Sequence, residues 1–461
     1  MTLIKNISGF RGTIGGENNK NLTPIDVVNS IAGFSIFLKK KYPNKTSYTV
    51  MTGRDGRKSG KVIHQIVNSV FSSMGINVID CGISTTPTLC WGVLNNESVA
   101  GLMITASHNP EEYNGLKFFN SYGEFLARED VVEVIKNSEK ETYEFSPNDK
   151  LGSIDTYHNL IEDHINAIVN LEILPINDIK KLNINITADA INSGGAISIP
   201  KLLDKLDISY QIINSEIEGK FSHTPEPLKE NLEELSKEIV KNKSDFGIAV
   251  DPDVDRLVFF DENGEILSEE NTQVLCSDFV LSQKKGSTVS TLSSSNALKD
   301  ITKKYGCDYY FTPVGEMNVV KKMKEVGAIV GGEGGGGIIY PELHYGRDAL
   351  VGIALFLGLI VKKGKAVSEI MKDYPIYYMK KLKISLKDSA LIDSAFDKIV
   401  NKYSDLSPNT EDGVRIDFDN GWVHMRKSNT EPIVRIFSES SSQNIADDIA
   451  LMIEKEIKDL S

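Results

Sequence analysis

Short apolar runs separated by longer amphipathic stretches recur along most of this chain, and this alternation restricts the fold more than any other feature of the sequence. The apolar runs have the length of buried strands, and the amphipathic stretches have the apolar spacing of helices. The predicted strands are 48–51, 77–80, 184–187 and 246–250, and the predicted helices are 24–40, 61–73, 157–171 and 231–241. Strands and helices in alternation indicate α/β layers around parallel sheets.

The chain has 461 residues, which is too long for one ordinary hydrophobic core. Three segments, VAGLMITASHNP, DFGIAVDPDVDR and GAIVGGEGGGG, each join an apolar run to a loop of unusual composition. They predict three related α/β domains whose loops share one ligand site, because ligands bind at the carboxyl ends of parallel strands. From about residue 373 a strand pattern between two helical patterns predicts a smaller α+β domain. The predicted domains are 1–150, 151–258, 259–374 and 375–461.

The formal net charge of −13 argues against a nucleic-acid partner and against an anionic membrane surface, since both require a basic face. The four cysteines form no Cys-x-x-Cys pair and the first residues, MTLIKNISGF, show no secretory pattern, so we expect a cytoplasmic protein with reduced thiols. The longest apolar run, 349–361, is too short to span a bilayer and predicts a buried helix. An anionic substrate would require a local cluster of basic residues.

The segment ITASHNP, residues 104–110, places Ser107 and His108 in a turn directly after an apolar run. Ser107 is either a nucleophile or a turn residue, because serine and asparagine before proline commonly bond their own backbone. Adjacent side chains of an extended chain point apart, so Ser107 and His108 do not form a nucleophile and base pair by themselves. The segment alone leaves both interpretations open.

The segment DPDVDR places Asp251, Asp253 and Asp255 at alternate positions, followed by Arg256. Three carboxylates this close repel one another unless a cation or several donors compensate, and their oxygens can converge on Mg²⁺. A calcium loop also begins Asp-x-Asp-x-Asp, and Glu262 stands at its twelfth position, but Arg256 replaces the expected glycine and an apolar run follows. A solvated acidic turn is the other alternative. We predict a magnesium site.

The segment GGEGGGG, residues 331–337, has Glu333 as its only functional side chain and is too rich in glycine for the interior of a strand or helix. Glycine allows close approach of the backbone to a ligand, and Glu333 can accept hydrogen bonds from hydroxyl groups. A nucleotide phosphate loop would need a Gly-Lys-Ser/Thr ending, which is missing here. A flexible linker remains an alternative.

The segment RKSNTEPIVR, residues 426–435, combines Arg426 with Ser428, Asn429 and Thr430. Guanidinium and hydroxyl donors in one tight loop suit a phosphate dianion, although a plain hairpin turn has a similar composition. Other basic residues stand among glycines or beside the loops, and they complete the local cluster that an acidic protein handling phosphates requires: Arg11, Arg54, Arg57, Lys117 and Arg256.

In this order, the four loops resemble those of the α-D-phosphohexomutase superfamily, which includes phosphoglucomutases, phosphomannomutases and phosphoglucosamine mutases. The likeness covers essentially the whole chain, and the segments GISTTPT and GEGGGGIIYPELHYGRDALVG are most similar to the phosphoglucosamine mutase branch of bacteria and archaea. It implies three related α/β domains and a C-terminal α+β domain of the TATA-box-binding-protein-like type around one central cleft.

The resemblance also implies a role for each loop. Ser107 would carry a phosphoryl group and, together with the three aspartates of DPDVDR, would bind Mg²⁺. Glu333, with Gly335 beside it, would bind the sugar. The residues around the transferring phosphate would be Arg11, His108, Lys117 and Arg256, and those that bind the other phosphate would be Arg426, Ser428, Asn429, Thr430 and Arg435.

One position departs from the superfamily pattern. Many members end the sugar loop in histidine, whereas this chain has Gly337. The general base is therefore in doubt, with Lys117, His108 and His344 as candidates.

The implied reaction transfers the phosphoryl group of Ser107 to a hexose 6-phosphate, after which the bisphosphate returns its other phosphoryl group to the serine. A hexose 1,6-bisphosphate would act as activator, and the enzyme would be a monomer or homodimer. We expect conversion of glucosamine 6-phosphate to glucosamine 1-phosphate, with His344 or Asp348 discriminating at position 2, and phosphomannomutase/phosphoglucomutase activity as the alternative. The rivals from other classes are a non-catalytic sugar-phosphate-binding protein and a phosphatase with Asp251 as nucleophile and Asp253 as acid.

Overall fold

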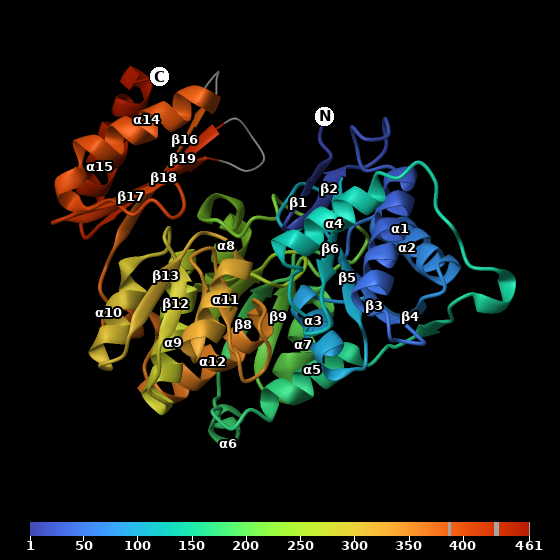
Figure 1. Ribbon diagram of the computed structural model, residues 1–461. Coiled ribbons are helices and arrows are strands. Elements are labelled where there is room, and N and C mark those ends of the chain that lie inside the picture. The colour runs from blue at the N-terminus through green and yellow to red at the C-terminus, as the bar shows by residue number, and fades with distance from the viewer. Residues whose placement is uncertain (386–388, 428–432, 461) are drawn as a thin grey trace. The chain divides into compact units, whose positions relative to one another are not determined.

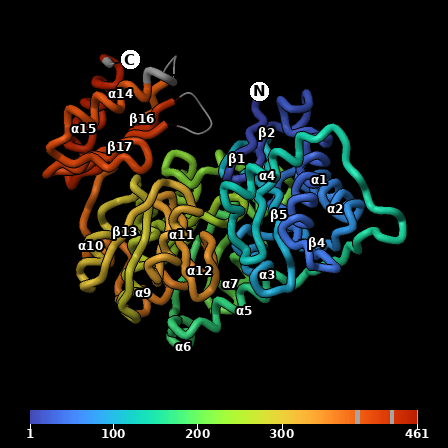
Figure 2. Tube along the Cα trace, viewed as in Figure 1, coloured from blue at the N-terminus to red at the C-terminus, as the bar shows by residue number. Residues whose placement is uncertain are grey.

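The computed structural model describes the backbone of residues 1–385, 389–427 and 433–460 (Figure 1). These residues form two compact units, one of residues 1–272 with 336–368 and one of residues 273–335 with 369–461. The first unit includes residues 336–368 although they follow part of the second unit in the sequence. Figure 2 shows the course of the chain from its N-terminus to its C-terminus.

The first unit contains a seven-stranded mixed sheet. Its strands are β1 (Ile4–Asn6), β2 (Gly9–Thr13), β3 (Thr49–Arg54), β4 (Asn77–Ile83), β5 (Ala100–Ile104), β6 (Tyr113–Phe119) and β7 (Ile154–Thr156). They are ordered β1-β2-β6-β5-β3-β4-β7. Strand β3 runs parallel to β4 and β5, whereas β6 runs antiparallel to β2 and β5.

Helices cover both faces of this sheet, because side chains alternate along each strand. The helices are α1 (Pro24–Lys41), α2 (Gly60–Ser73), α3 (Thr86–Asn95), α4 (Arg128–Ser138) and α5 (Leu160–Val169). Leu102 and Ile104 of β5 pack into a core with residues of α1, α2 and α4, whereas Met103 between them packs into a second core with residues of α3 and α5. The carboxyl end of β5 is thereby held from both sides.

A second sheet of the first unit has the order β11-β10-β8-β9. Its strands are β8 (Asn185–Asp189), β9 (Ser209–Ile213), β10 (Phe246–Val250) and β11 (Leu257–Phe260). The unit also contains α6 (Ile176–Ile179), α7 (Gly195–Lys205), α8 (Glu233–Asn242), β15 (Gly337–Ile339) and α12 (Ala349–Lys363). Helix α12 is buried over Ala349–Ile360, and its Phe356 stacks on Phe259 of β11 at 3.9 Å between ring centroids.

The second unit contains two sheets. The first has parallel strands in the order β13-β12-β14, and the second is antiparallel in the order β16-β19-β18-β17. The strands are β12 (Thr288–Thr291), β13 (Tyr309–Thr312), β14 (Val330–Glu333), β16 (Tyr378–Ser385), β17 (Val414–Phe418), β18 (Gly421–Lys427) and β19 (Ile433–Ser440). The helices are α9 (Glu269–Gln283), α10 (Asn296–Lys304), α11 (Glu316–Val326), α13 (Val367–Met371), α14 (Ser389–Lys402) and α15 (Gln443–Leu460).

Buried polar contacts connect the two sheets of the second unit. Arg415 donates to the carbonyl of Leu292 at 2.5 Å, and His424 Nδ1 lies 2.7 Å from Ser293 Oγ. The backbone N–H of Val314 donates to Asp412 at 2.8 Å. The C-terminal sheet is therefore joined to the sheet that carries Glu333 by hydrogen bonds between buried and partly buried groups.

The predicted α/β class with a C-terminal α+β domain is confirmed. The predicted strands and helices are present with small shifts of their ends, and the apolar run 349–361 is a buried helix. Within the described part of the chain, no helix combines the length and the apolar character needed to cross a membrane.

The interpretation of GGEGGGG as too rich in glycine for a strand is wrong. Residues Val330–Glu333 form β14, and Gly337 begins β15. A Cβ at Gly331 would lie 2.5 Å from Met323 Sδ, so α11 can lie against β14 only because that side chain is missing. Packing of the helix, which the local composition cannot show, makes the glycine suitable for this strand.

Candidate active site

Ser107 lies in the loop after β5, where tertiary contacts hold it in an unusual backbone conformation. Its φ of 48° is in the left-handed region, which non-glycine residues seldom adopt. Its N–H donates to Thr105 Oγ1 at 2.9 Å, and its carbonyl accepts from Arg57 Nη2 at 2.6 Å. Strain that is maintained by surrounding contacts is typical of functional loops.

Arg57 holds this loop by its carbonyl groups. The guanidinium donates to the carbonyls of Ser107, Asn109, Pro110 and Tyr113 at 2.6 to 2.9 Å. Its Nε pairs with the Asp55 carboxylate at 3.1 Å, and the Arg57 side chain is fully buried. We predicted Arg57 as part of the cluster for phosphates, but its donors are used within the protein. The structure instead gives it a role in fixing the loop.

The loop after β10 places three buried aspartates beside Ser107. Ser107 Oγ donates to Asp251 Oδ2 at 2.7 Å. Asp251 Oδ1 accepts from the backbone N–H groups of Asp255 at 3.1 Å and Arg256 at 3.2 Å. Asp251, Asp253 and Asp255 each have one carboxylate oxygen within 4.8 Å of an oxygen of the other two. The two predicted loops therefore meet within the first unit.

Lys117 and Arg347 neutralise the negative charges of two of these aspartates by forming ion pairs with them. Lys117 Nζ, on β6, lies 2.6 Å from Asp253 Oδ2 and 3.1 Å from Asp255 Oδ2, and Arg347 donates to Asp255 Oδ2 at 2.8 Å. Burial alone would lower the pKa of Lys117, but the two aspartates raise it. Burial alone would raise the pKa of Asp255, but Arg347 and Lys117 lower it. Both groups are therefore charged near neutral pH.

Asp251 has no such ion pair among the described residues, and Arg256 offsets its burial only in part. Burial, Asp255 and Asp253 raise the pKa of Asp251 well above its usual range. Asp253 Oδ1 and Asp255 Oδ1 are buried and have no hydrogen-bond partner among the described residues. A hard divalent cation would satisfy these oxygens and stabilise the ionised form of Asp251. The aspartate triplet therefore fits a metal ion that prefers oxygen ligands.

Further basic side chains lie beside Ser107. Arg11 donates from β2 to Asn109 Oδ1 at 3.3 Å, and Arg256 lies 3.4 Å from Glu226 Oε1. Arg256 Nε is buried and has no hydrogen-bond partner within the described structure. Burial and Arg256 lower the pKa of Arg11. Like-charged guanidinium groups held close together favour an anion in their vicinity.

The three candidate bases differ in protonation and in burial. Arg256, burial and Arg11 lower the pKa of His108 well below its usual value, so its imidazole is neutral near pH 7. Lys117 is held protonated by its aspartates. His344 is 2 % exposed and lies 3.3 Å from Asp348, so we do not retain it as a base, nor either residue as a sugar contact. His108 is the candidate that can accept a proton.

Glu333 lies in the second unit, at the end of β14. Its Oε1 accepts from the backbone N–H of Gly315 at 3.1 Å, at the start of α11. The next residue, Gly334, donates its N–H to Ser294 Oγ at 3.2 Å. The loop with the predicted Gly335 is thus positioned by the strands β12 and β14 and the N-terminus of α11.

Arg426 and Arg435 face each other on adjacent strands, β18 and β19. The Nε of each is buried and has no hydrogen-bond partner among the described residues. Burial lowers the pKa of Arg426, as does Arg435, although Asp412 and Glu333 oppose this effect. Like charges directly across a sheet are destabilising, so this pair favours binding of an anion. The predicted partners in the same loop, Ser428, Asn429 and Thr430, lie outside the described residues.

Two functional positions escaped the sequence analysis. Arg347 contacts Asp255, and a Cβ at Gly337 would lie 2.3 Å from Arg347 Cδ, so the glycine makes room for the arginine. Thr86 donates from Oγ1 to Asp253 Oδ2, and its N–H donates to the Asp253 carbonyl at 2.8 Å. Both stand in segments that were noted for their similarity to relatives, GISTTPT and YPELHYGRDALVG. The similarity of these two segments to the superfamily was the feature of the sequence that could have identified both residues.

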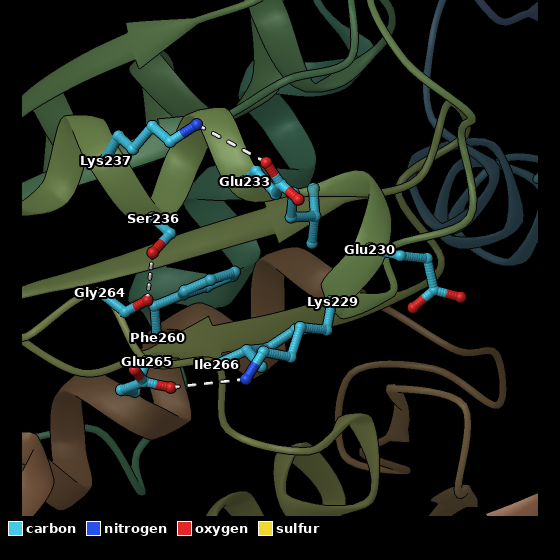
Figure 3. A pocket seen from close by; sticks show the side chains of 10 residues that line it. Lys229, Glu230, Glu233, Ser236, Lys237, Phe260, Gly264, Glu265 and Ile266 are labelled. Carbon is cyan, nitrogen blue, oxygen red and sulfur yellow. Dashed lines mark hydrogen bonds and ion pairs between the residues drawn. The ribbon is translucent and has the colours of Figure 1, made fainter.

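The pocket shown in Figure 3 lies beside α8 and β11 in the first unit and has a volume of about 400 Å³. Its polar contacts are internal, with Ser236 donating to the Gly264 carbonyl at 2.6 Å and Lys229 lying 3.6 Å from Glu265. Its lining includes none of the predicted site residues. We assign it no part in the candidate site.

Comparisons with known proteins cover most of the chain. The α/β/α domains I, II and III of phosphoglucomutase/phosphomannomutase match residues 3–145, 162–264 and 269–377, and the C-terminal domain matches residues 362–456. A phosphoglucomutase/phosphomannomutase of Thermococcus kodakarensis is 35 % identical over 94 % of this chain and 95 % of that protein. A phosphoglucosamine/phosphogalactosamine mutase of Sulfurisphaera tokodaii is 31 % identical over 97 % of each.

Solved structures share the fold. A crystal structure of a phosphoglucomutase/phosphomannomutase family protein from Burkholderia thailandensis superposes with a TM-score of 0.83 and 23 % sequence identity. The match covers 99 % of this chain and 96 % of that one.

Proposed function

The chain belongs to the phosphoglucomutase/phosphomannomutase family, and from this premise we propose that it interconverts a hexose 6-phosphate and a hexose 1-phosphate through phosphorylated Ser107 and a bisphosphate intermediate. It is a phosphohexomutase of the isomerase class. The observation that carries the proposal is the 2.7 Å contact between Ser107 Oγ and Asp251, in a loop that Arg57 fixes.

In the first step the sugar hydroxyl oxygen forms a bond to the phosphorus on Ser107, and the bond between phosphorus and Ser107 Oγ breaks. The hydroxyl proton passes to a base, for which we propose neutral His108. Lys117 and Arg11 stabilise the negative charge on the phosphoryl oxygens as it moves. The second step is the reverse reaction at the other phosphate of the bisphosphate, and it restores phosphorylated Ser107.

Asp251, Asp253 and Asp255 would hold Mg²⁺, with an oxygen of Ser107 or of its phosphoryl group as a further ligand. When bound, the ion would draw negative charge from the phosphoryl group during transfer. The Oδ1 atoms of Asp253 and Asp255 support this assignment, because they are buried and have no hydrogen-bond partner within the described residues. Thr86 and Lys117 hold Asp253 in place for that purpose.

We assign the choice of substrate to the second unit. Arg426 and Arg435 would bind the phosphate that is not transferred, because the buried Nε of each has no hydrogen-bond partner in the part of the chain that the structure describes. Glu333 would accept hydrogen bonds from two sugar hydroxyls. A hexose 1,6-bisphosphate would be the activator, since it phosphorylates Ser107 by the same chemistry.

For the sugar we propose glucosamine 6-phosphate and glucosamine 1-phosphate. The sequence YPELHYGRDALVG and the name of the relative from Sulfurisphaera tokodaii support this choice, whereas the name of the relative from Thermococcus kodakarensis supports the glucose and mannose phosphates. Kinetics on the three 6-phosphates, side by side, test the assignment. If glucosamine 6-phosphate has the lowest kcat/KM, the phosphomannomutase/phosphoglucomutase alternative replaces it.

The same assay tests the rival phosphatase. That mechanism needs an oxygen of Asp251 that is free to attack phosphorus, but Oδ2 accepts from Ser107 and Oδ1 accepts from the backbone N–H groups of Asp255 and Arg256. We expect isomerisation without stoichiometric release of inorganic phosphate. Phosphate release at the rate of substrate consumption would favour the phosphatase and exclude the mutase.

A further inference from the structure

A second cluster of buried ionisable groups lies in the first unit, and the proposed reaction does not use it. His164 comes from α5, and His344 and Asp348 precede α12. Their exposed fractions are 0 %, 2 % and 0 %. Asp348 Oδ2 lies 3.1 Å from His164 Nε2 and 3.3 Å from His344 Nε2. Three side chains that commonly bind transition metals thus converge in a site without solvent.

The outer atoms of two of these groups are fixed by hydrogen bonds. His164 Nδ1 lies 3.0 Å from Thr88 Oγ1. Asp348 Oδ1 accepts from the backbone N–H groups of Leu350 at 2.8 Å and Val351 at 3.3 Å. Metal-binding histidines and carboxylates are usually held in this way by a partner on the side away from the ion. The atoms on the inner side, His164 Nε2, His344 Nε2 and Asp348 Oδ2, face one another.

Hydrogen bonding does not explain the whole cluster. The contact between His344 Nε2 and Asp348 has the geometry of a hydrogen bond. His164 Nε2 has no aligned hydrogen-bond partner among the described residues, although it lies 3.1 Å from the same carboxylate oxygen. Two ligands of a tetrahedral zinc ion with bonds of about 2.0 Å lie about 3.3 Å apart, close to the two distances seen here. Ligands of one ion also need no alignment with each other.

We propose that His164, His344 and Asp348 form a structural site for a transition-metal ion of the zinc type, separate from the aspartate triplet. Two imidazole nitrogens and one carboxylate suit Zn²⁺, whereas the triplet offers only oxygen and suits Mg²⁺.

The position of the site indicates what the ion would do. Asp348 caps α12, and the next residue, Ala349, donates its N–H to the carbonyl of Val254 at 3.2 Å. Val254 lies between Asp253 and Asp255 of the triplet and has a φ of 62°. An ion that joins α5 to the start of α12 would therefore stabilise the backbone of the triplet loop. We expect its loss to lower the stability of the first unit more than the rate of phosphoryl transfer.

The test uses the full chain, expressed without a histidine tag in medium with zinc, and measures metal content by plasma mass spectrometry after dialysis. We expect about one zinc ion per chain, and a higher melting temperature with micromolar Zn²⁺ than after treatment with a strong chelator. His164→Gln and His344→Gln should lose the zinc. Asp253→Asn, which alters the triplet, should keep it.

A spectroscopic measurement on the wild-type chain does not depend on the folding of any variant. Trp91 lies 5.6 Å from His164 between ring centroids, so Co²⁺ in the cluster should quench its fluorescence and give the visible absorption of a tetrahedral site. Zinc should displace the cobalt and restore the fluorescence, whereas excess Mg²⁺ should not. The proposal is overturned if purified protein and zinc-treated protein both lack bound zinc, or if Asp253→Asn abolishes the binding and the histidine variants keep it.

Discussion

The first and second units place like charges together in opposite ways. In the first unit, Asp253 and Asp255 each have a cation within hydrogen-bonding distance, and the loop is fixed before any ligand binds. In the second unit, Arg426 and Arg435 lie across from each other, and the Nε of each has no hydrogen-bond partner among the described residues. The difference indicates that the first unit is organised in advance for chemistry, whereas the arginine pair of the second unit is suited to an anionic group of the substrate.

Replacement of Ser107, in the first unit, should have the largest effect on catalysis. Ser107→Ala deletes the atom that carries the phosphoryl group, so kcat should fall by about 10⁴-fold or more, with little change in the melting temperature. Ser193→Ala is a matched control from the same unit, because its hydroxyl bonds backbone groups of Gly56 and Pro252. Comparable activity of Ser107→Ala and the wild type would exclude a phosphoserine mechanism.

The aspartate triplet gives the next largest expected effect. Asp253→Asn keeps the shape of the side chain but removes a charge, and loss of charge stabilisation should lower kcat by about 10²- to 10³-fold at saturating Mg²⁺. The concentration of Mg²⁺ for half-maximal rate should rise, and chelation of the wild type should be reversible. An unchanged magnesium response in the variant would show that the triplet does not bind the ion.

In the second unit, Arg426→Ala should act mainly on binding. Loss of a charge-assisted phosphate contact costs about 1.5 to 3 kcal/mol, which corresponds to a KM raised about 10- to 150-fold with a smaller change in kcat. Lys427→Ala is the control, because this neighbouring lysine pairs with Asp393. If kcat falls and KM stays constant, the assignment of substrate selection to the second unit is wrong.

The smallest effect is expected from a substitution at Arg347 that keeps the positive charge but changes the position of the donor to Asp255. Arg347→Lys retains the cation but cannot match the reach of the guanidinium to Asp255, so we expect about a tenfold loss of kcat. Gly337→Ala should do the same by displacing the arginine stem. Wild-type kinetics in both variants would show that Arg347 contributes only to packing.

The sequence predicted the parts of the site that lie within single loops. The loops with Ser107 and the aspartates could be singled out locally because each follows a short strand and has an unusual composition, and the structure brings the two loops together. The role of Ser107 was left open by its own segment and was predicted only from the resemblance to the superfamily. The role of Arg57 could not be foreseen, because its acceptors are carbonyls of a loop 50 or more residues away. The same holds for His164 and Asp348, which only the tertiary fold places in contact.

The GGEGGGG segment shows a different limit. Its glycines suggested an irregular loop, but Gly331 is a strand residue because Met323 of α11 fills the space of its side chain. The sequence shows that position 331 has no side chain, whereas only the packing of Met323 against it shows the reason. The register of β18 and β19, which places Arg426 opposite Arg435, also depends on pairing that the sequence alone does not specify.

Transfer of a labelled phosphoryl group tests the central claim most directly. The enzyme is incubated with a hexose 1,6-bisphosphate carrying radioactive phosphate, quenched, and mapped by peptide mass spectrometry, and a second sample is chased with unlabelled hexose 6-phosphate before quenching. We predict about one labelled phosphoryl group per chain on Ser107, which the chase transfers to the sugar as bisphosphate. Label on Asp251, or label that stays on the protein while the sugar phosphate is isomerised, would contradict the account.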